Sequence, residues 1–305
     1  MANAMPAADV DVTADLVREL LAGQHPDLAG LPISFLANGW DNTLFRLGDS
    51  LVIRLPRREL GARIILGEQR WLPLLAPRLP VRIPSPERTG HPASSYPYSW
   101  SVVPYLPGVP AADAQQSLDL PVVTRQLAEF FAALHVPAPP DAPVNPFRGV
   151  PLADRADSFE ANLAIATRSP DANMLLARGS AIRLAWTDAL EASAYQGPPV
   201  WLHGDAHPLN ILVDRGVISG IIDFGDLTGG DPACDLSVAW ELLPVDWHQE
   251  FQAGYLAAGG VSDDGLWRRA RGWALSYALV FLAHSADNPR LHRVGEQTLA
   301  RVLAG

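Results

Sequence analysis

Apolar residues in the first third of the chain come in short runs separated by turn-forming residues. Five runs have the alternation or the length of a β-strand: residues 31–35, 43–47, 51–56, 82–86 and 99–105. The segments 37–42 and 48–50, which separate the first three runs, hold the Gly, Asn, Asp and Ser residues that turns favour. Strands joined by such short turns pair antiparallel, so this part of the chain predicts a small antiparallel sheet.

Helical periodicity replaces this pattern along the rest of the chain. In the first third it predicts helices only at residues 10–23 and 60–75. Seven later segments place their apolar residues on one helix face: 122–135, 158–166, 180–193, 235–242, 247–258, 264–284 and 291–303. The proline-rich residues 137–151 are expected to form an irregular surface loop. The later part of the chain is therefore predicted to be mostly helical.

A cluster of helix- and strand-breaking residues separates these two patterns. Pro104, Pro107 and Gly108 follow the last predicted strand and precede the first helix of the later part. We therefore expect an α+β fold with two domains, residues 1–104 and residues 105–305.

Composition and charge exclude several classes of protein. A chain of 305 residues with 48% hydrophobic and 18% charged residues is typical of an ordered globular protein of one or two domains. The formal net charge of -10 argues against nucleic acid or an anionic membrane as the partner, and it favours a cationic small molecule. All 23 basic residues are arginine, so the absence of lysine at any one position carries little information.

The cysteine count and the N-terminus favour a cytoplasmic protein. Cys234 is the only cysteine, so no internal disulfide can form. Asp9, Asp11 and Asp15 stand where a signal peptide would be basic. The longest membrane-like run, residues 273–283, is shorter than the roughly 20 residues that a transmembrane helix requires. The oligomeric state is left open.

Residues 201–225 hold a group of polar side chains between strongly apolar runs. Asp205 follows the run that ends at Leu202, Asn210 comes shortly after it, and Asp223 ends a further apolar run beyond a turn. Phosphoryl transfer needs an acid that orients the acceptor hydroxyl and oxygen ligands for Mg²⁺. We therefore interpret Asp205 as the catalytic acid and Asn210 and Asp223 as the ligands of Mg²⁺.

The same stretch resembles the aminoglycoside phosphotransferase family. Residues 203–210 read HGDAHPLN, where that family's loop usually reads H-G-D-x-H-x-x-N. Residues 223–225 read DFG, and residues 230–236 read GDPACDL, which is similar to the family's G-D-P-x-x-D-L. The motifs are separated as in the family, and the resemblance covers nearly the whole chain.

This resemblance implies a bilobal protein-kinase-like fold. The N-lobe, residues 1–104, would hold a small antiparallel β-sheet with one main helix and would bind the nucleotide. The larger, mostly α-helical C-lobe, residues 105–305, would carry the catalytic loop and the substrate site. The phosphoryl donor would be ATP or GTP with Mg²⁺, bound between the two lobes.

The resemblance also assigns roles around the catalytic loop. His203 and Asp235 would support the loop, with His203 as a hydrogen-bonding residue and not a proton shuttle. Asp226, Asp231 and Glu241 are candidates for binding the substrate, since they would attract a cationic acceptor. The competing interpretation is that such acids are helix caps or lie on solvated faces.

Two residues are expected to grip the phosphates of the nucleotide. Arg54 stands in the predicted strand 51–56 where the family carries a lysine, and Glu68 in the following helix is its expected partner. Arginine can bind phosphate through two nitrogens, so the charge is retained although the geometry differs. The competing interpretation of Arg54 is a solvated residue at a strand edge.

Four further positions are implied at the nucleotide. Asn42 and Thr43 lie at the turn that would cover the phosphates, which contains no G-x-G-x-x-G. Pro104 has no N–H, so the purine would bind the carbonyl group of Val103 and the amide of Tyr105.

The acceptor is predicted to be a small molecule. Gly204 precedes Asp205 where regulated protein kinases carry arginine. The segment between Asp223 and Asp235 is too short for a long activation loop. An aminoglycoside-type antibiotic is the leading acceptor, which would make the protein a resistance kinase.

Several alternatives remain open from the sequence. A macrolide or a metabolite such as choline or homoserine could replace the aminoglycoside as the acceptor. A catalytically silent nucleotide-binding protein of the same fold is another alternative, favoured only by Arg54. A hydrolase metal site built from His203, Asp205 and His207 is also conceivable, but it leaves Asn210 and the DFG triplet unexplained.

Overall fold

The computed structural model describes residues 7–168 and 173–304. The chain divides into two compact units. The first, named here the sheet unit, comprises residues 7–77 and 82–107. The second, the helical unit, comprises residues 108–168 and 173–304 together with the short segment 78–81.

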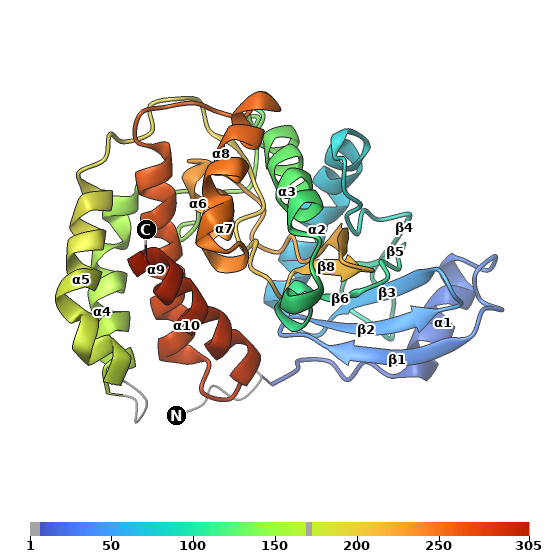
Figure 1. Ribbon diagram of the computed structural model, residues 1–305. Coiled ribbons are helices and arrows are strands. Elements are labelled where there is room, and N and C mark those ends of the chain that lie inside the picture. The colour runs from blue at the N-terminus through green and yellow to red at the C-terminus, as the bar shows by residue number, and fades with distance from the viewer. Residues whose placement is uncertain (1–6, 169–172, 305) are drawn as a thin grey trace. The chain divides into compact units, whose positions relative to one another are not determined.

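The sheet unit is built on one antiparallel sheet (Figure 1). Its strands are β1 (Ile33–Asn38), β2 (Asn42–Leu47), β3 (Leu51–Pro56), β4 (Arg88–Gly90) and β5 (Trp100–Pro104). Their order across the sheet is β1-β2-β3-β5-β4, and every neighbouring pair is antiparallel. The prediction of a strand at residues 82–86 is wrong, because Pro84 and Pro86 lack the N–H groups that hydrogen bonding between strands requires. The edge strand of the sheet is β4 instead.

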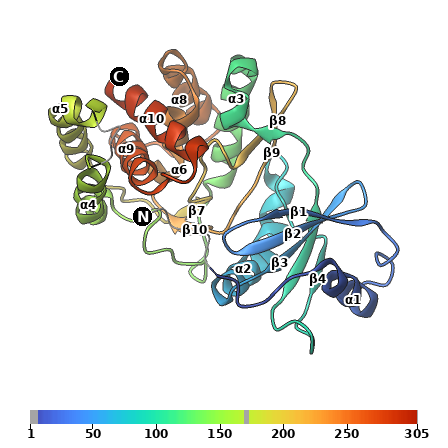
Figure 2. The same cartoon turned by 90° about the horizontal axis from the view of Figure 1, so that it is seen from below.

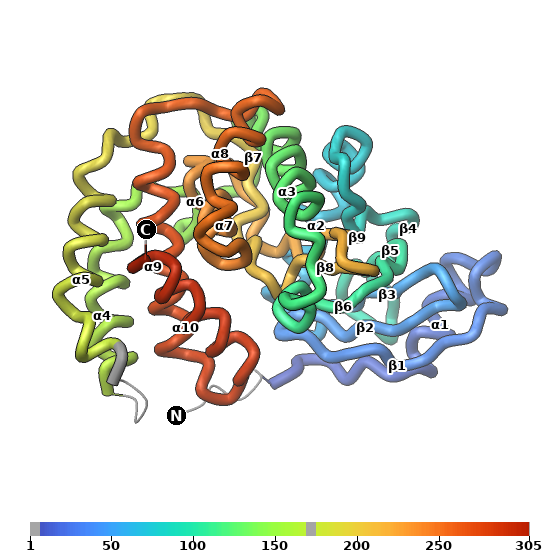
Figure 3. Tube along the Cα trace, viewed as in Figure 1, coloured from blue at the N-terminus to red at the C-terminus, as the bar shows by residue number. Residues whose placement is uncertain are grey.

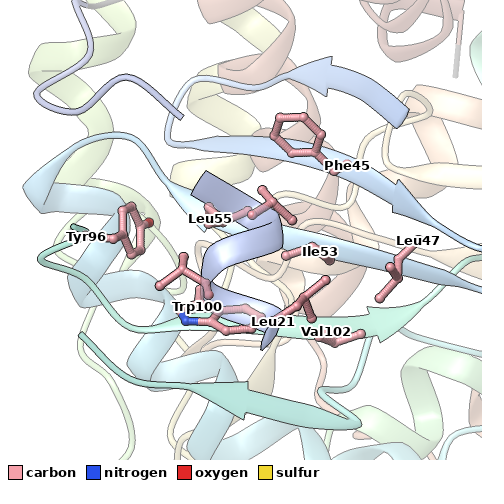
Figure 4. Packing of buried hydrophobic residues seen from close by; sticks show 10 residues of the cluster. Leu21, Phe45, Leu47, Ile53, Leu55, Tyr96, Trp100 and Val102 are labelled. Atoms are coloured by element: carbon pink, nitrogen blue, oxygen red, sulfur yellow. The ribbon is translucent and has the colours of Figure 1, made fainter. Parts of the chain in front are cut away.

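Two helices flank this sheet. The first, α1 (Ala14–Gln24), begins where the Thr13 side chain accepts the amide of Leu16 at 3.2 Å, and it buries Val17, Leu20 and Leu21. Figure 4 shows Leu21 packed in a cluster with side chains from three strands and from the segment before β5. The labelled members are Leu21, Phe45, Leu47, Ile53, Leu55, Tyr96, Trp100 and Val102.

The second helix, α2 (Glu59–Leu75), contacts β3 and β5. Side chains alternate between the faces of a strand, so Ile53 and Leu55 point into the cluster with α1 while Arg54 points to the other face of β3. There Arg54 meets Glu68 of α2.

The helical unit is organised around α9 (Leu266–His284), which is buried along most of its length. Three long helices pack against it: α4 (Ala156–Ala166), α5 (Asn173–Leu190) and α10 (Pro289–Ala304) (Figure 1). The short α6 (Ala233–Leu236) also contacts α9, and it is followed by α7 (Val238–Leu242). On another side of the unit, α3 (Leu120–Leu134) packs against α8 (His248–Ala257), as Figure 2 shows.

Two small sheets lie inside this helical unit. One has three strands in the order β6-β8-β9, namely β6 (Val109–Pro110), β8 (Ile211–Asp214) and β9 (Val217–Ile221). The other pairs β7 (Val200–Leu202) with β10 (Thr228–Gly230). The hairpin turn between β8 and β9 uses Arg215 and Gly216, both with positive φ, as a two-residue turn between twisted strands requires.

The irregular connection at residues 135–151, named here the α3–α4 loop, is tied to these strands (Figure 3). The amide of Ala138 donates to the Pro199 carbonyl oxygen at 2.9 Å, and the Gly149 carbonyl oxygen accepts the amide of Asp231 at 2.9 Å. The hydroxyl of Thr228 in β10 donates to the Pro143 carbonyl oxygen at 2.9 Å. Backbone and side-chain hydrogen bonds therefore give a proline-rich segment a defined path.

The small antiparallel sheet and the larger helical part confirm the predicted α+β class. Within residues 7–168 and 173–304, none of the helices combines the length and the apolar character that crossing a bilayer would demand.

Candidate active site

A single buried acid holds the loop that follows β7. Asp235 in α6 accepts the amide of His203 at 2.7 Å through Oδ2 and the amide of Gly204 at 2.8 Å through Oδ1. The fully buried ring of His203 accepts the amide of Asp205 at Nδ1 and lies 2.9 Å from the Ile222 carbonyl oxygen at Nε2. An accepting Nδ1 assigns the ring proton to Nε2. Both ring nitrogens are therefore engaged, and the two predicted loop-supporting residues lie together.

Gly204 allows the loop to approach a neighbouring segment. Its φ is +85°, and a Cβ built there would lie 2.4 Å from the carbonyl oxygen of Asp226. No other residue fits this backbone at so short a distance. The carbonyl oxygen of Gly204 accepts the hydroxyl of Tyr277 at 2.9 Å, which fixes the peptide that leads to Asp205.

The carboxylate of Asp205 is partly exposed. One of its oxygens contacts an arginine, and the other contacts a histidine. Its Oδ1 accepts Nη2 of Arg148 at 3.1 Å, and its Oδ2 lies 3.4 Å from Nε2 of His207. Burial by itself would raise the pKa of Asp205, but the opposing effects of His207 and Arg148 are larger and hold this pKa well below its usual range. The ionised form of this carboxylate is therefore favoured.

His207 complements this carboxylate. Its Nδ1 accepts the amide of Leu209 at 3.2 Å, so Nε2 carries the ring proton and faces Asp205. Burial would lower the pKa of His207, yet the charge of Asp205 and the hydrogen bond to it outweigh burial and raise this pKa.

Arg148, in the α3–α4 loop, joins two acids of the site. Its Nε donates to Oδ2 of Asp226 at 3.0 Å while its Nη2 reaches Asp205. The guanidinium carbon lies 5.0 Å from the ring centroid of Tyr277, within the range of a cation–π contact. Asn145 of the same loop donates to Oδ1 of Asp226 at 2.8 Å. The α3–α4 loop is thus part of the surroundings of Asp205.

The hairpin of β8 and β9 brings Asn210 and Asp223 together at its open end, opposite the turn. Ile211 pairs with Ile221, and the next rung is a bond of 2.9 Å from the amide of Ile222 to the carbonyl oxygen of Asn210. Asp223 follows at once, with a φ of +65° that is rare for a residue other than glycine. Strained backbone of this kind is common at functional sites.

These two side chains present oxygen atoms that suit Mg²⁺. The hydrogen bond from Asn210 to the Asp205 carbonyl oxygen, 2.9 Å long, uses the amide nitrogen and leaves Oδ1 available. Asp223 is exposed, and its Oδ1 receives a long contact of 3.4 Å from the amide of Gly225. One carboxylate and one amide oxygen are a set that Mg²⁺ accepts when phosphate and water supply its other ligands.

The hydrolase alternative gains no support from the described part of the chain. Among residues 7–168 and 173–304, no three His, Cys, Asp or Glu side chains are grouped as a metal ion would need. His203 in particular has both ring nitrogens engaged.

In the sheet unit, Arg54 and Glu68 form an ion pair with 3.0 Å between Nη2 and Oε1. Both side chains are largely buried, at 10% and 3% exposure. Arg54 is therefore not a solvated strand-edge residue, because it is covered by α2. A buried charge needs a partner, and Glu68 supplies it.

The other predicted nucleotide-binding residues already have contacts inside the sheet unit. The hydroxyl of Thr43 donates to Oδ1 of Asn38 at 3.0 Å, while Oδ1 of Asn42 is buried without a hydrogen bond. Val103 pairs with Val52 of β3. The amide of Tyr105, which was expected to bind the purine, donates to the Ser50 carbonyl oxygen at 2.7 Å. That amide is thus satisfied within the unit.

The three acids predicted at the substrate lie in different surroundings. Asp226 has a donor at each oxygen, from Asn145 and Arg148. Asp231 is buried in an ion pair with Arg269, with bonds of 2.7 and 3.1 Å. Glu241 in α7 is 2% exposed, and burial, partly opposed by the Ser237 hydroxyl, raises its pKa to about 7.

Comparison with known proteins now decides the family. The model of the phosphotransferase enzyme family matches residues 32–273. The chain belongs to this phosphotransferase family. Family membership thus extends over the sheet unit and most of the helical unit, including the loop of Asp205.

Individual relatives agree with this family. An aminoglycoside 3'-phosphotransferase from Streptomyces fradiae is 30% identical over 165 residues, which make up 52% of this chain and 58% of that protein. The match therefore spans less than two thirds of that relative.

Solved structures show the same phosphotransferase fold. The GDP complex of wild-type aminoglycoside 2'-phosphotransferase-IIIa superposes with a TM-score of 0.61 at 20% identity, covering 94% of this chain and 98% of the other. The macrolide 2'-phosphotransferase MphH from Brachybacterium faecium gives 0.58 at 23% identity, covering 93% and 97%. At such identities the likeness establishes the fold, which agrees with the kinase-like fold that the motifs implied.

Arg148 was not predicted as a site residue from the sequence. The residue lies 57 positions before Asp205, in a segment that looked only irregular and rich in proline. No spacing rule connects the two positions, so the contact emerges only from the folded chain. His135 is a second omission, since its Nε2 lies 3.3 Å from Oδ2 of Asp235 beneath the loop.

Proposed function

We propose that the protein transfers the γ-phosphoryl group of a Mg²⁺-bound nucleotide, ATP or GTP, to a hydroxyl of a small molecule. The observation that carries this proposal is the arrangement of one loop and one hairpin. They present an ionised Asp205 together with the oxygens of Asn210 and Asp223. The leading acceptor class is the aminoglycosides, the named substrates of several relatives with this fold or family.

The role of Asp205 follows from its charge and its neighbours. An acceptor hydroxyl that donates to the carboxylate is oriented with its oxygen lone pair free to attack phosphorus. The low pKa makes Asp205 a weak base, so the hydroxyl proton is transferred late, when the new P–O bond has formed and the oxygen has become acidic. This order suits the loose transition state of phosphoryl transfer.

Metal and nucleotide would be bound by separate groups. Asn210 and Asp223 would hold Mg²⁺, which neutralises charge on the phosphates when it is bound. Arg54, fixed by Glu68, would bind nucleotide phosphate, with Asn42, Thr43 and the Val103 carbonyl group as further contacts. We also propose a cytoplasmic location, where the nucleotide is available, and a role in antibiotic resistance.

A macrolide acceptor is the second candidate. Proteins that phosphorylate macrolides share the fold, with TM-scores of 0.58. The internal pairing of Asp226 and Asp231 favours it, because these acids already have arginine counter-charges and are less available to the several ammonium groups of an aminoglycoside.

The test is nucleotide turnover with Mg²⁺ across aminoglycosides, macrolides and amino alcohols, for the wild type and Asp205→Asn. Because the variant cannot accept the hydroxyl hydrogen bond as an anion, we expect kcat to fall by about 10²–10⁴ while nucleotide affinity stays close to normal. Asp214→Asn, an exposed acid at the turn of the same hairpin, is the control and should retain turnover. Near-normal turnover by Asp205→Asn would disprove its role, and nucleotide binding without any acceptor-dependent turnover would favour a silent protein.

A further inference from the structure

Of the three acids that were expected to attract a cationic acceptor, two are paired with arginines of the protein and one is buried. Asp226 is paired with Arg148 and Asn145, and Asp231 with Arg269. Glu241 is buried, and its Oε1 accepts the Ser237 hydroxyl. Asp226 and Asp231 thus already have counter-charges within the protein, and Glu241 is shielded from solvent.

Arg148 places a permanent positive charge where the acceptor must react. Its Nη2 lies 3.1 Å from Oδ1 of Asp205. An acceptor hydroxyl that is bonded to Oδ1 lies about 3 Å from that oxygen. A hydroxyl that is bonded to Oδ2 instead lies about 5 Å from Oδ1. The reacting oxygen therefore lies within roughly 8 Å of the guanidinium, which is inside the screening length of physiological salt.

This charge is also held in place. Arg148 is bound at two nitrogens by two different acids, and one of them, Asp226, is itself fixed by Asn145. Its side chain is only 19% exposed and lies near the ring of Tyr277. An acceptor ammonium would have to break these bonds to displace the guanidinium, or else bind beside it as a like charge.

We infer that Arg148 determines acceptor specificity: it selects acceptors whose reacting hydroxyl has uncharged neighbours, such as other hydroxyls or ethers, and disfavours those with an ammonium group beside it. The inference rests on the proposed phosphotransfer at Asp205 and names the chemical class of the acceptor at that site. It concerns only the groups next to the reacting hydroxyl.

The experiment measures kcat/KM for one acceptor in a charged and an uncharged form. Kanamycin and its fully N-acetylated derivative are compared for the wild type, Arg148→Gln and Arg148→Lys. In the Gln variant the side chain can still donate to a carboxylate but carries no charge. We expect Arg148→Gln to shift the ratio of kcat/KM about tenfold toward kanamycin, because a like charge has been removed.

Arg148→Lys separates charge from geometry. Lysine keeps the charge but loses the fork that joins two acids. The Lys variant should therefore keep the acceptor ratio of the wild type while its kcat falls. Arg183→Gln, which removes the same charge from an exposed pair between Arg183 of α5 and Glu160 of α4, should leave both the ratio and kcat unchanged.

The outcomes distinguish this inference from the proposed function. If Arg148→Gln lowers kcat/KM equally for both forms, Arg148 has only a structural or positioning role and the inference is overturned, while phosphotransfer stands. If Arg148→Lys shifts the ratio as much as Arg148→Gln, charge is not the cause and the inference is overturned as well. If the wild type turns over neither form although it binds nucleotide, the aminoglycoside proposal fails together with this inference.

Discussion

Two arginines of the helical unit each bridge two aspartates, and they do so in different surroundings. Arg269 joins Asp231 and Asp263 with four hydrogen bonds of 2.7 to 3.1 Å and adds a fifth to the Ser193 carbonyl oxygen. Its side chain is 3% exposed. Arg148 makes one hydrogen bond to Asp205 and one to Asp226, and its side chain is 19% exposed.

The comparison shows that the same pairing chemistry serves different purposes at different depths. A buried charge that loses its partner is costly, so the cluster of Arg269 contributes to the stability of the fold. Around Arg148 the carboxylates remain partly exposed, at 26% for Asp205 and 33% for Asp226. Exposed ion pairs contribute little to stability, so the pairs of Arg148 are better explained by the chemistry of the site.

The strongest test of this contrast removes the buried arginine. Arg269→Leu leaves Asp231 in the interior without a counter-charge, and we expect the free energy of unfolding to fall by about 3–5 kcal/mol. Urea unfolding followed by tryptophan fluorescence measures this change. Arg268→Leu is the control, because Arg268 is 43% exposed and its loss should cost less than about 1 kcal/mol. Equal effects of the two substitutions would show that burial does not separate these arginines.

Glu241 is a buried acid of another kind, because its carboxylate is bonded by a hydroxyl, that of Ser237. Its pKa in the folded protein is about 7, above the usual 4.5, so between these values the folded carboxyl keeps a proton that the unfolded one has lost. Its contribution to stability is therefore fully present below about pH 4.5 and is lost as the pH rises through 7.

Glu241→Gln removes this titration while keeping an oxygen that can accept the Ser237 hydroxyl. We expect the unfolding free energy of the wild type, relative to the variant, to decline by about 1–3 kcal/mol between pH 5 and pH 8. Urea unfolding of both proteins across this range gives the difference directly. Parallel curves would mean that the folded pKa of Glu241 is not raised.

The smallest expected effect on stability belongs to the arginine of the site. Arg148→Gln should lower the free energy of unfolding by about 1 kcal/mol or less, because its partners are partly solvated once it is removed. The same urea titration used for Arg269→Leu provides the value. A loss comparable to that of Arg269→Leu would place Arg148 in the structural framework and would remove the contrast between the two clusters.

Local periodicity predicted most elements of the fold. The predicted strand at residues 51–56 coincides with β3, and the helix predicted at 264–284 agrees with α9 to within two residues at its start. The failure at residues 82–86 has a local cause, because an apolar run with Pro84 and Pro86 cannot complete a hydrogen-bond ladder. Apolar character predicted burial there, and Ile83 is indeed buried, but outside any strand.

Part of the site was predictable because its residues lie close together in the sequence. Asp205, Asn210 and Asp223 lie on one loop and one hairpin, so their spacing along the chain constrains their positions in space. The substrate acids were not predictable in this way. Whether Asp226 or Asp231 faces a ligand or an internal arginine depends on segments far away in the sequence.

The class of fold, the family motifs and the loop that carries the proposed reaction could all be predicted from the sequence. These features depend on the periods of strands and helices and on short-range turn geometry, which neighbouring residues specify. The pairing of charged side chains, in contrast, became known only from the folded chain. Folding brought Arg148 across 57 positions to Asp205 and buried Arg269 between two acids, because packing against distant segments sets both the partners of a charge and its exposure to water.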